Sequence, residues 1–145
     1  MIKTKWTNVY KKEEIFLKYY EKEGRIAMRA SRGEIKIEEI LQESGLNFKE
    51  EYIFSDLVSS SGRPLRFDFA ILDDNNELDF LIEFQGIQHY EPKSKFGGIS
   101  GLRKQQYNDM KKREYCAKHN IPLVIIPYWD EGRLDYDYIM TAAGY

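Results

Sequence analysis

The sequence has one cysteine and two histidines among 145 residues, and this scarcity excludes two kinds of structural support. Cys116 alone cannot form an intramolecular disulfide, and with only His89 and His119 beside it the chain lacks the ligands of a structural zinc site. No apolar run approaches the roughly 18 residues that cross a bilayer, and the opening residues contain no hydrophobic segment typical of a signal peptide. We therefore expect a cytoplasmic protein with no membrane association.

With only four prolines, the chain also lacks a Pro- or Gly-rich linker that would divide it. Hydrophobic residues make up 42% of the chain and charged residues 32%, which is enough apolar material for a folded core. A length of 145 residues is typical of one domain. We predict a single domain over residues 1–145, with residues 1–30 as a basic helical N-terminal extension.

The formal net charge of −2 conceals two basic segments. Residues 1–33 hold nine Lys or Arg against four Glu, and residues 93–113 hold seven against one Asp. Such an uneven distribution suits a protein that binds a polyanion on one face. Ordinary solvated lysines are the alternative explanation.

Hydrophobic periodicity predicts an α/β fold. Apolar residues at helical spacing indicate four helices, at residues 8–23, 31–44, 102–119 and 136–143. Alternating or continuous apolar runs indicate four strands, at residues 52–57, 65–71, 80–85 and 122–127. We expect a central mixed sheet flanked by helices, made of an antiparallel three-strand meander and one further buried strand. Residues 86–101 are expected to form a long loop without regular elements.

Two acidic residues of the central strands are expected to meet. A two-residue turn at Asn75 and Asn76 would place Asp68 directly opposite Glu83, with Cβ atoms about 4.5–5.5 Å apart. Alternation would place apolar side chains of the second strand on one face and polar ones on the other. The apolar set is Leu65, Phe67, Phe69 and Ile71, and the opposite set is Arg66, Asp68 and Ala70.

Opposed carboxylates destabilise a strand pair unless a cation, a shared proton or a nearby Arg offsets the repulsion. Arg66 is the neighbouring candidate for simple neutralisation. A divalent metal is the more economical explanation, because Asp68, Glu83 and the side-chain carbonyl of Gln85 offer the hard oxygen ligands that Mg²⁺ or Mn²⁺ prefers. Such ligands are typical of enzymes that cleave phosphodiesters.

The ordered pattern of these residues resembles a known family. Glu34 on a helix and Asp68 in a strand are followed by the run Glu-Phe-Gln-Gly-Ile-Gln-His-Tyr at residues 83–90, and by Asp109 and Lys112 on a helix. Over about residues 31–130 this resembles the PD-(D/E)XK nuclease superfamily. The branch is the one similar to very-short-patch-repair endonucleases, which includes phage homing endonucleases named after an EDxHD motif. The resemblance implies a restriction-endonuclease-like fold.

The resemblance also implies roles for individual residues. Glu34 would be the helix carboxylate and a metal ligand, and Asp68 the central metal ligand. Gln85 stands where many relatives have Lys, and it brings neither positive charge nor a titratable amine. His89 is the natural substitute as general base, with Asp109 holding its tautomer. Glu34 also completes a capping box with Ser31, and a lone His at a strand end is alternatively a surface residue.

Further residues are expected to contact DNA. Gln105, Asp109, Lys112 and Cys116 share one stripe of the 102–119 helix, and the alternative is a solvated stripe held by an Asp109–Lys112 pair. The segment 93–104 combines cations with an aromatic residue and two glycines, which suits a phosphate clamp, although an ordinary flexible loop is the alternative. The predicted DNA-binding residues are Arg66, Lys93, Lys95, Phe96, Arg103, Lys104, Gln105 and Lys112.

We therefore expect a Mg²⁺- or Mn²⁺-dependent DNA endonuclease that nicks one strand per monomer, acting as a monomer or weak homodimer. A phage-encoded protein in the host cytoplasm would fit the resemblance. One alternative is a junction- or mismatch-selective nuclease. Another is a catalytically silent module that binds nucleic acid or protein and retains the fold.

Overall fold

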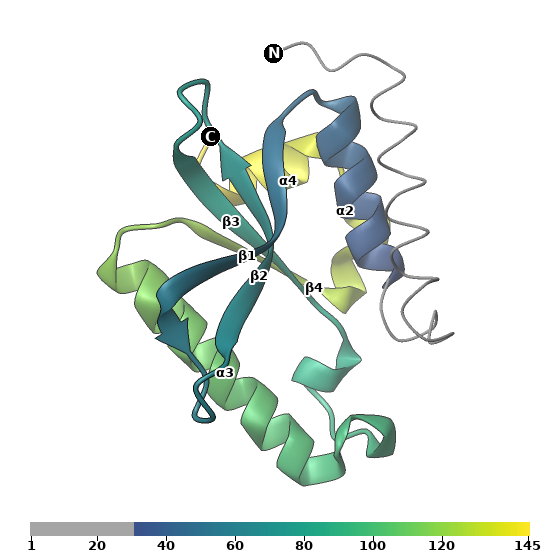
Figure 1. Cartoon of the computed structure of the whole chain (residues 1–145). Coiled ribbons are helices and arrows are strands. Elements are labelled where there is room, and N and C mark those ends of the chain that lie inside the picture. The colour runs from purple at the N-terminus through teal and green to yellow at the C-terminus, as the bar shows by residue number, and fades with distance from the viewer. Residues whose placement is uncertain (1–30) are drawn as a thin grey trace, which may run out of the picture.

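A computed structural model describes residues 31–145 of the chain (Figure 1). The predicted helix at 8–23 and the predicted extension at 1–30 lie outside the described residues. The helices are α2 (Arg32–Glu43), α3 (Gly98–Lys118) and α4 (Tyr136–Ala142), and the strands are β1 (Asn47–Val58), β2 (Pro64–Leu72), β3 (Leu78–Gln85) and β4 (Leu123–Pro127). Within residues 31–145, three short 3₁₀ helices complete the order, namely η2 (Ile87–His89), η3 (Ser94–Phe96) and η4 (Tyr128–Arg133).

The strands form one sheet in the order β1-β2-β3-β4. β1 to β3 are an antiparallel meander, and β4 lies parallel to β3. Because parallel neighbours need a crossover connection, the chain passes through α3 between β3 and β4. The predicted α/β class and mixed sheet are confirmed. Strand β1 begins at Asn47, five residues before the predicted start.

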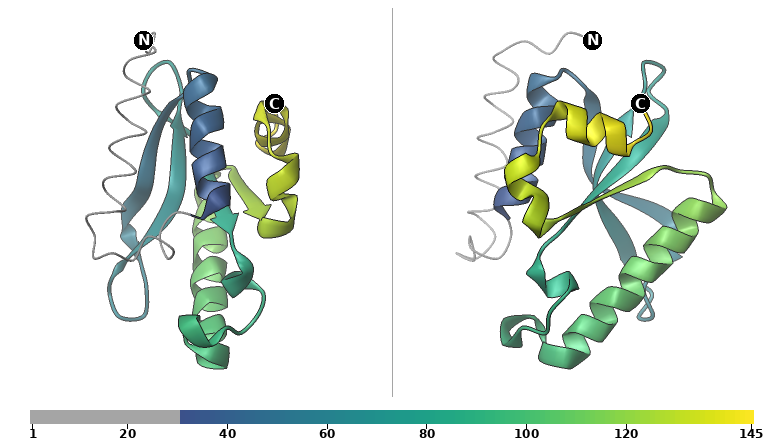
Figure 2. Two further views of the ribbon diagram at one scale, coloured as in Figure 1. Left: turned by 90° about the vertical axis from the view of Figure 1, so that its right-hand side faces the viewer. Right: turned by 180° about the vertical axis from the view of Figure 1, so that it is seen from behind.

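Two hydrophobic clusters pack on the two faces of the sheet. Successive side chains of β3 point to opposite faces of the sheet. Phe80, Ile82 and Phe84 therefore belong to one cluster, and Leu81 belongs to the other. The first cluster includes residues of α2 and α4, and the second includes Cys116 of α3. Figure 1 and Figure 2 show α2 and α4 along the upper half of the strongly twisted sheet and α3 along its lower half.

The expected face assignment along β2 is wrong for half of its apolar residues. Leu65 and Phe67 belong to the α3-side cluster, whereas Phe69 and Ile71 belong to the α2-side cluster. The change falls at Asp68, opposite the stretch of β1 where Glu51 has a left-handed backbone with φ 48°. The described β2–β3 pairing begins at Phe69, and Asp68 exchanges side-chain bonds with β3 instead, so the regular alternation of a ladder does not extend to Leu65 and Phe67.

The connection between β2 and β3 is not the predicted two-residue turn. Asp73 and Glu77 close a longer loop, in which the Asp73 carboxylate accepts the N–H groups of Asn75 and Glu77 and Asn76 adopts φ 65°. A bulge between Ile71 and Leu72 compensates for the change in loop length. Pairs such as Phe69 with Ile82 therefore have the predicted register.

The segment after β3 is more regular than predicted. Residues 86–101 contain η2 and η3, and α3 begins at Gly98 rather than at residue 102. The N–H of Gly98 donates to the carbonyl of Lys93, which closes the turn before α3. At Gly101 an added Cβ would lie 1.8 Å from the Phe96 carbonyl oxygen, so only glycine allows this close approach.

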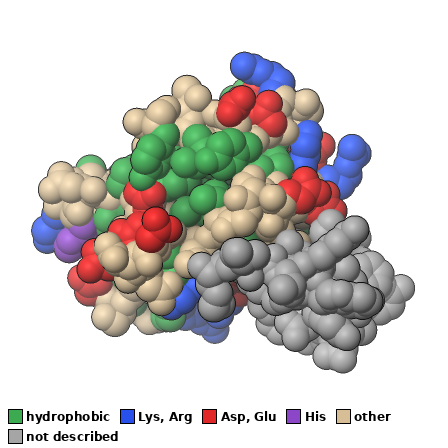
Figure 3. All heavy atoms as spheres, turned by 90° about the horizontal axis from the view of Figure 1, so that it is seen from above, with side chains coloured by type: hydrophobic (Ala, Val, Ile, Leu, Met, Phe, Trp, Pro, Cys, Tyr) green, Lys and Arg blue, Asp and Glu red, His purple; other side chains and the backbone are tan. Residues whose placement is uncertain are grey.

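Charged side chains are unevenly distributed over the surface. On the face drawn in Figure 3, hydrophobic side chains occupy the centre, acidic side chains lie beside them, and Lys and Arg are peripheral. Several basic residues of α3, including Arg103, Lys104 and Arg113, are exposed. Within residues 31–145, no helix combines the length and apolar character that crossing a membrane requires.

Candidate active site

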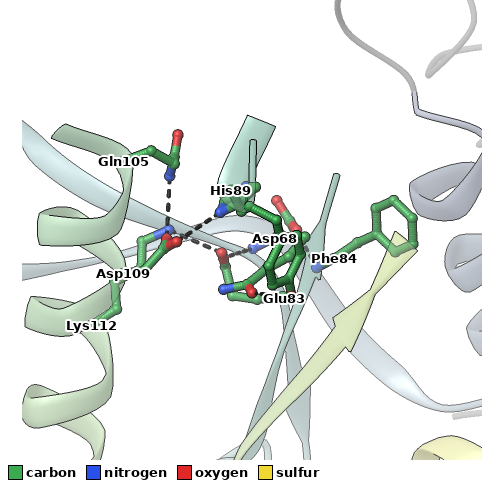
Figure 4. A network of polar contacts seen from close by, with 9 residues as sticks. Asp68, Glu83, Phe84, His89, Gln105, Asp109 and Lys112 are labelled. Atoms are coloured by element: carbon green, nitrogen blue, oxygen red, sulfur yellow. Dashed lines mark hydrogen bonds and ion pairs between the residues drawn. The ribbon is translucent and has the colours of Figure 1, made fainter. Parts of the chain in front are cut away.

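Asp68 and Glu83 meet across β2 and β3, as the register predicts. The Asp68 N–H donates to Glu83 Oε1 at 2.9 Å, and the Phe84 N–H donates to Asp68 Oδ2 at 2.7 Å. Each carboxylate therefore takes up a backbone donor of the opposite strand. Figure 4 shows these two residues at the centre of a polar network that extends to α3.

A lysine of α3 lies against this pair, and Arg66 does not. Lys112 Nζ is 3.1 Å from Glu83 Oε2 and 5.3 Å from the centre of the Phe67 ring. Arg66 instead forms an ion pair with Glu51 at 2.9 Å, so the alternative in which Arg66 neutralises the pair is wrong. Both oxygens of Glu83 thus have partners, while Asp68 Oδ1 has no hydrogen bond within the described residues.

Asp68 also lines a pocket between α2 and the first two strands. We call this the acidic pocket, and its lining residues are Glu34, Ile35, Glu38, Glu50, Glu51, Asp68 and Phe69. Glu34 is placed there by the start of α2, where the Ser31 hydroxyl accepts the Glu34 N–H at 3.1 Å. The predicted Ser31 cap is confirmed, and it coexists with a place for the Glu34 carboxylate in the pocket.

The carboxylates of the acidic pocket repel one another. Burial, with the neighbouring Asp68 carboxylate as the second cause, raises the pKa of Glu34 to about 8. Burial also raises the pKa of Asp68 to about 6, although Lys112 and His89 act against the shift. The pKa of Glu83 is raised by burial and by Asp68. A further cation would relieve this repulsion at Glu34 and Asp68, because the pKa values of both carboxyls stay raised although Lys112 and His89 act on Asp68.

His89 and Asp109 form a buried pair beside Asp68. His89 Nδ1 lies 2.8 Å from Asp109 Oδ2, and the two side chains are 9% and 6% exposed. Gln105 Nε2 donates to Asp109 Oδ1 at 3.2 Å. With the carboxylate as acceptor, a neutral His89 ring carries its proton on Nδ1 and has the Nε2 lone pair free to accept one. The alternative of a surface histidine is wrong.

The predicted α3 stripe is confirmed, but its interpretation as a solvated face is not. Asp109, Lys112 and Cys116 are all buried. The alternative Asp109–Lys112 pair is replaced by two longer-range contacts, from Asp109 to His89 and from Lys112 to Glu83. These contacts join α3 to the end of β3 on one side of the sheet.

Gln85 is buried, and its side-chain carbonyl is already engaged. Tyr90 Oη donates to Gln85 Oε1 at 2.7 Å. The oxygen expected to bind a metal therefore serves to hold the segment that follows β3. Gln85 is therefore a weaker candidate for a metal ligand than the carboxylates of the acidic pocket.

The other predicted DNA-binding residues lie around the start of α3. Lys93 is 3.3 Å from Glu91, and Lys95 Nζ lies over the Phe96 ring at 5.1 Å. Arg103 and Lys104 are exposed in the first turns of α3. The segment therefore presents several cations near the end of the helix that carries Gln105 and Asp109.

The donors of the acidic pocket fit a hard divalent cation. Glu34 and Asp68 offer carboxylate oxygens, and Glu50 Oε1 is buried without a hydrogen-bond partner in the described part of the chain. Among residues 31–145, no three His, Cys, Asp or Glu side chains are already grouped closely enough to enclose an ion. Mg²⁺ does not need such a group, because it binds through one or two carboxylates and keeps several waters.

Sequence reasoning missed Glu50, Glu51 and Tyr90. Both glutamates belong to β1, whose predicted span began after them. The adjacent pair of carboxylates in front of an aromatic strand residue was the available signal. Tyr90 was within the motif that suggested the resemblance, but only the fold brings its hydroxyl to Gln85.

Two viral proteins are similar to part of this chain. "Uncharacterized protein 094L" of Frog virus 3 (isolate Goorha) is 43% identical over 70 residues, which cover 47% of this chain and 43% of the viral protein. "Uncharacterized protein 307L" of Invertebrate iridescent virus 6 is 33% identical over 70 residues, covering 48% and 36% respectively. The aligned part thus spans less than half of either relative. No family model and no solved structure matches the chain.

Proposed function

We propose that this protein is a Mg²⁺- or Mn²⁺-dependent endonuclease that hydrolyses DNA phosphodiester bonds, with a fold related to that of restriction endonucleases. The observation that carries the proposal is the pair of carboxylates, Glu34 and Asp68, that share the acidic pocket beside the His89–Asp109 pair and whose pKa values are both raised. Lys112 forms its ion pair with Glu83, while Glu34 and Asp68 leave further carboxylates next to a candidate proton acceptor. The resemblance to PD-(D/E)XK nucleases agrees with this assignment.

Glu34 and Asp68 would hold the ion, with Glu50 as a further carboxylate of the same pocket. When bound there, a divalent ion supplies Lewis-acid stabilisation of the charge that develops on a phosphate. Glu83 and Lys112 fix the position of Asp68 through the backbone bond between the two strands. Magnesium ligation therefore needs no contribution from Glu83.

His89 would take the proton from the attacking water at Nε2. Its Nδ1 faces Asp109, which orients the ring and stabilises the charge that the ring acquires. Gln105 holds the other oxygen of Asp109 and so limits rotation of that carboxylate. Many relatives have a lysine at the position of Gln85. In this chain His89 would accept the proton and Lys112 would supply the local positive charge, so these two residues offset the missing lysine.

Asp68→Asn tests this function. We expect Mg²⁺-dependent nicking of supercoiled plasmid to fall by about 10³-fold, since the variant loses the central anionic ligand while keeping the shape of the side chain. Asp74→Asn, in the exposed turn between β2 and β3, is the matched control and should cleave like the wild type. Undiminished nicking by Asp68→Asn would disprove the assignment.

The silent binding module is the second candidate, and the full engagement of Glu83 favours it, because both oxygens already have partners. Calorimetric titration with Mn²⁺ separates the candidates. A nuclease should bind Mn²⁺ through Glu34 and Asp68, and the binding should be lost in Asp68→Asn. A silent module should bind DNA in a salt-dependent manner without metal binding or cleavage.

A further inference from the structure

Three aromatic rings, one of them exposed, form a cluster beside the candidate site. We call Tyr90, Tyr128 and Trp129 the aromatic platform. The Trp129 ring centre lies 4.7 Å from that of Tyr90 and 5.3 Å from that of Tyr128, and those two tyrosines are 5.9 Å apart. Trp129 is 59% exposed, although its neighbours are half-buried. A large ring held by two others yet open to solvent has a free face for a ligand.

The platform lies at the carboxyl ends of the two parallel strands. Gln85 and Pro127 are paired residues at the ends of β3 and β4, and Tyr128 follows Pro127 directly. Tyr90 follows His89 and bonds Gln85 through its hydroxyl. The platform therefore lies next to His89, the proposed proton acceptor, because Tyr90 is the following residue. Ligands of parallel sheets commonly bind at this edge.

Cations flank the platform. Asp130 and Glu131, the residues after Trp129, contact Arg133 at 3.3 Å and Arg32 at 3.8 Å respectively. The side chains of these two arginines are 75% and 91% exposed, so their guanidinium groups remain open to a further anion. Lys36 Nζ donates to the Glu131 carbonyl at 2.8 Å. An aromatic face bordered by exposed guanidinium groups suits a nucleic-acid strand, which offers flat bases and phosphates together.

We infer that the aromatic platform stacks an unpaired base of the DNA substrate next to the scissile phosphate. The inference rests on the proposed function and specifies its substrate class as DNA with an unpaired nucleotide at the cleavage position. Stacking on one ring face requires a base that has left the helix, because a paired base inside a duplex presents only its edges. Fully paired DNA would bind through the basic residues alone.

The test measures binding without cleavage. Trp6 and Trp129 are the two tryptophans, so a Trp6→Phe protein reports on Trp129 alone. In EDTA, this protein is titrated with a duplex closed by hairpins at both ends, and with the same duplex carrying one unpaired nucleotide. We expect quenching of Trp129 emission by the DNA with the unpaired nucleotide and not by the closed duplex. No quenching at saturating binding, or no binding of either DNA, would overturn the inference.

Substitutions give an independent measurement. Trp129→Ala should weaken binding of the DNA with the unpaired nucleotide by roughly 5- to 150-fold, the range for loss of one stacked base, and leave the closed duplex unaffected. Trp129→Phe should retain the preference. Tyr145→Ala is the control, since this residue is 68% exposed and its hydroxyl bonds Asp79 outside the platform. Equal weakening of both DNAs by Trp129→Ala, or of neither, would count against stacking.

The failures of the two proposals are distinguishable. Suppose that Mg²⁺-dependent cleavage occurs, but that Trp129 emission and the Trp129→Ala substitution respond equally to the two DNAs. The endonuclease assignment then stands and the platform inference fails. Suppose instead that Trp129 emission is quenched only by the DNA with the unpaired nucleotide, but that no cleavage occurs with Mg²⁺ or Mn²⁺. The platform inference then stands, and the protein is a module that binds DNA with an unpaired nucleotide.

Discussion

At the scale of residues, the site depends on how charge is divided among three carboxylates. Glu83 has Lys112 as a partner at 3.1 Å, while Glu34 and Asp68 face other carboxylates in the acidic pocket. The consequence is an energetic cost that is present whenever both are ionised and no cation is bound. A functional requirement would explain why such a cost is retained.

Glu34→Gln should show this cost directly. Because the pKa of Glu34 is raised from 4.5 to about 8 in the folded protein, the folded state binds more protons than the unfolded state between these values. Wild-type stability should therefore fall as the pH rises from 4.5 to 8. In EDTA, the variant should gain ~1–3 kcal/mol in unfolding free energy at pH 8, a figure reduced for partial solvent screening. Urea denaturation at pH 4.5 and pH 8 measures the difference.

Glu43→Gln is the control for this experiment. Glu43 lies on the same helix and is exposed, so its substitution should change stability by less than about 0.5 kcal/mol at either pH. A Glu34→Gln protein whose stability profile matches the wild type between pH 4.5 and pH 8 would contradict the repulsion that we assign to the pocket.

At the scale of elements, the start of α2 is placed by its contact with β3. Gly33 is buried, and a Cβ added there would lie 2.2 Å from the Phe84 ring. The helix backbone therefore lies directly against the ring, and this contact sets where the next residue, Glu34, enters the acidic pocket. The same strand supplies Glu83 to the opposite face, so β3 links both halves of the site.

Gly33→Ala should disturb both stability and the site. Phe84 is only 6% exposed and has little room to move, so we expect a loss of about 1–3 kcal/mol from overpacking. Separation of α2 from β3 should also reduce Mn²⁺ affinity. Gly132→Ala is the matched control, because its added Cβ would meet nothing within 4 Å. Thermal denaturation and calorimetry check both, and equal behaviour of the two variants would refute the role of this contact.

At the scale of the whole molecule, the separation of basic and acidic residues makes a net charge of −2 compatible with the DNA partner that we propose. The basic segment 93–113 forms the approach to α3 and most of that helix, while the acidic pocket lies between α2, β1 and β2. A DNA backbone held along α3 would lie away from most acidic side chains. Its affinity should then depend strongly on salt.

The paired substitution of Arg103 and Lys104 by Ala tests this arrangement. If each contacts one phosphate, the slope of log K against log salt concentration should become less steep by roughly 2. Lys49 and Arg63, both exposed on or beside β1, provide a control pair with the same change of net charge. Fluorescence anisotropy of duplex DNA at several salt concentrations measures the slopes, and equal slopes for the two pairs would exclude α3 as the DNA-binding surface.

Sequence alone determined the features that depend on short-range regularity. The types of the described helices and strands, the Ser31 cap, the shared stripe of α3 and the register between β2 and β3 follow from periodicity, capping and strand pairing. Even the wrong turn at Asn75 and Asn76 did not change the register, because a bulge compensated for the longer loop.

Only the tertiary structure decided which charged side chains contact one another. Lys112 reaches Glu83 across 29 positions, and Arg66 bonds Glu51 rather than the central pair. The left-handed backbone of Glu51 coincides with the change of face along β2, and the acidic pocket combines residues of three elements. These contacts depend on how α2 and α3 pack against a twisted sheet. Such packing is set by long-range burial, which no local pattern in the sequence specifies.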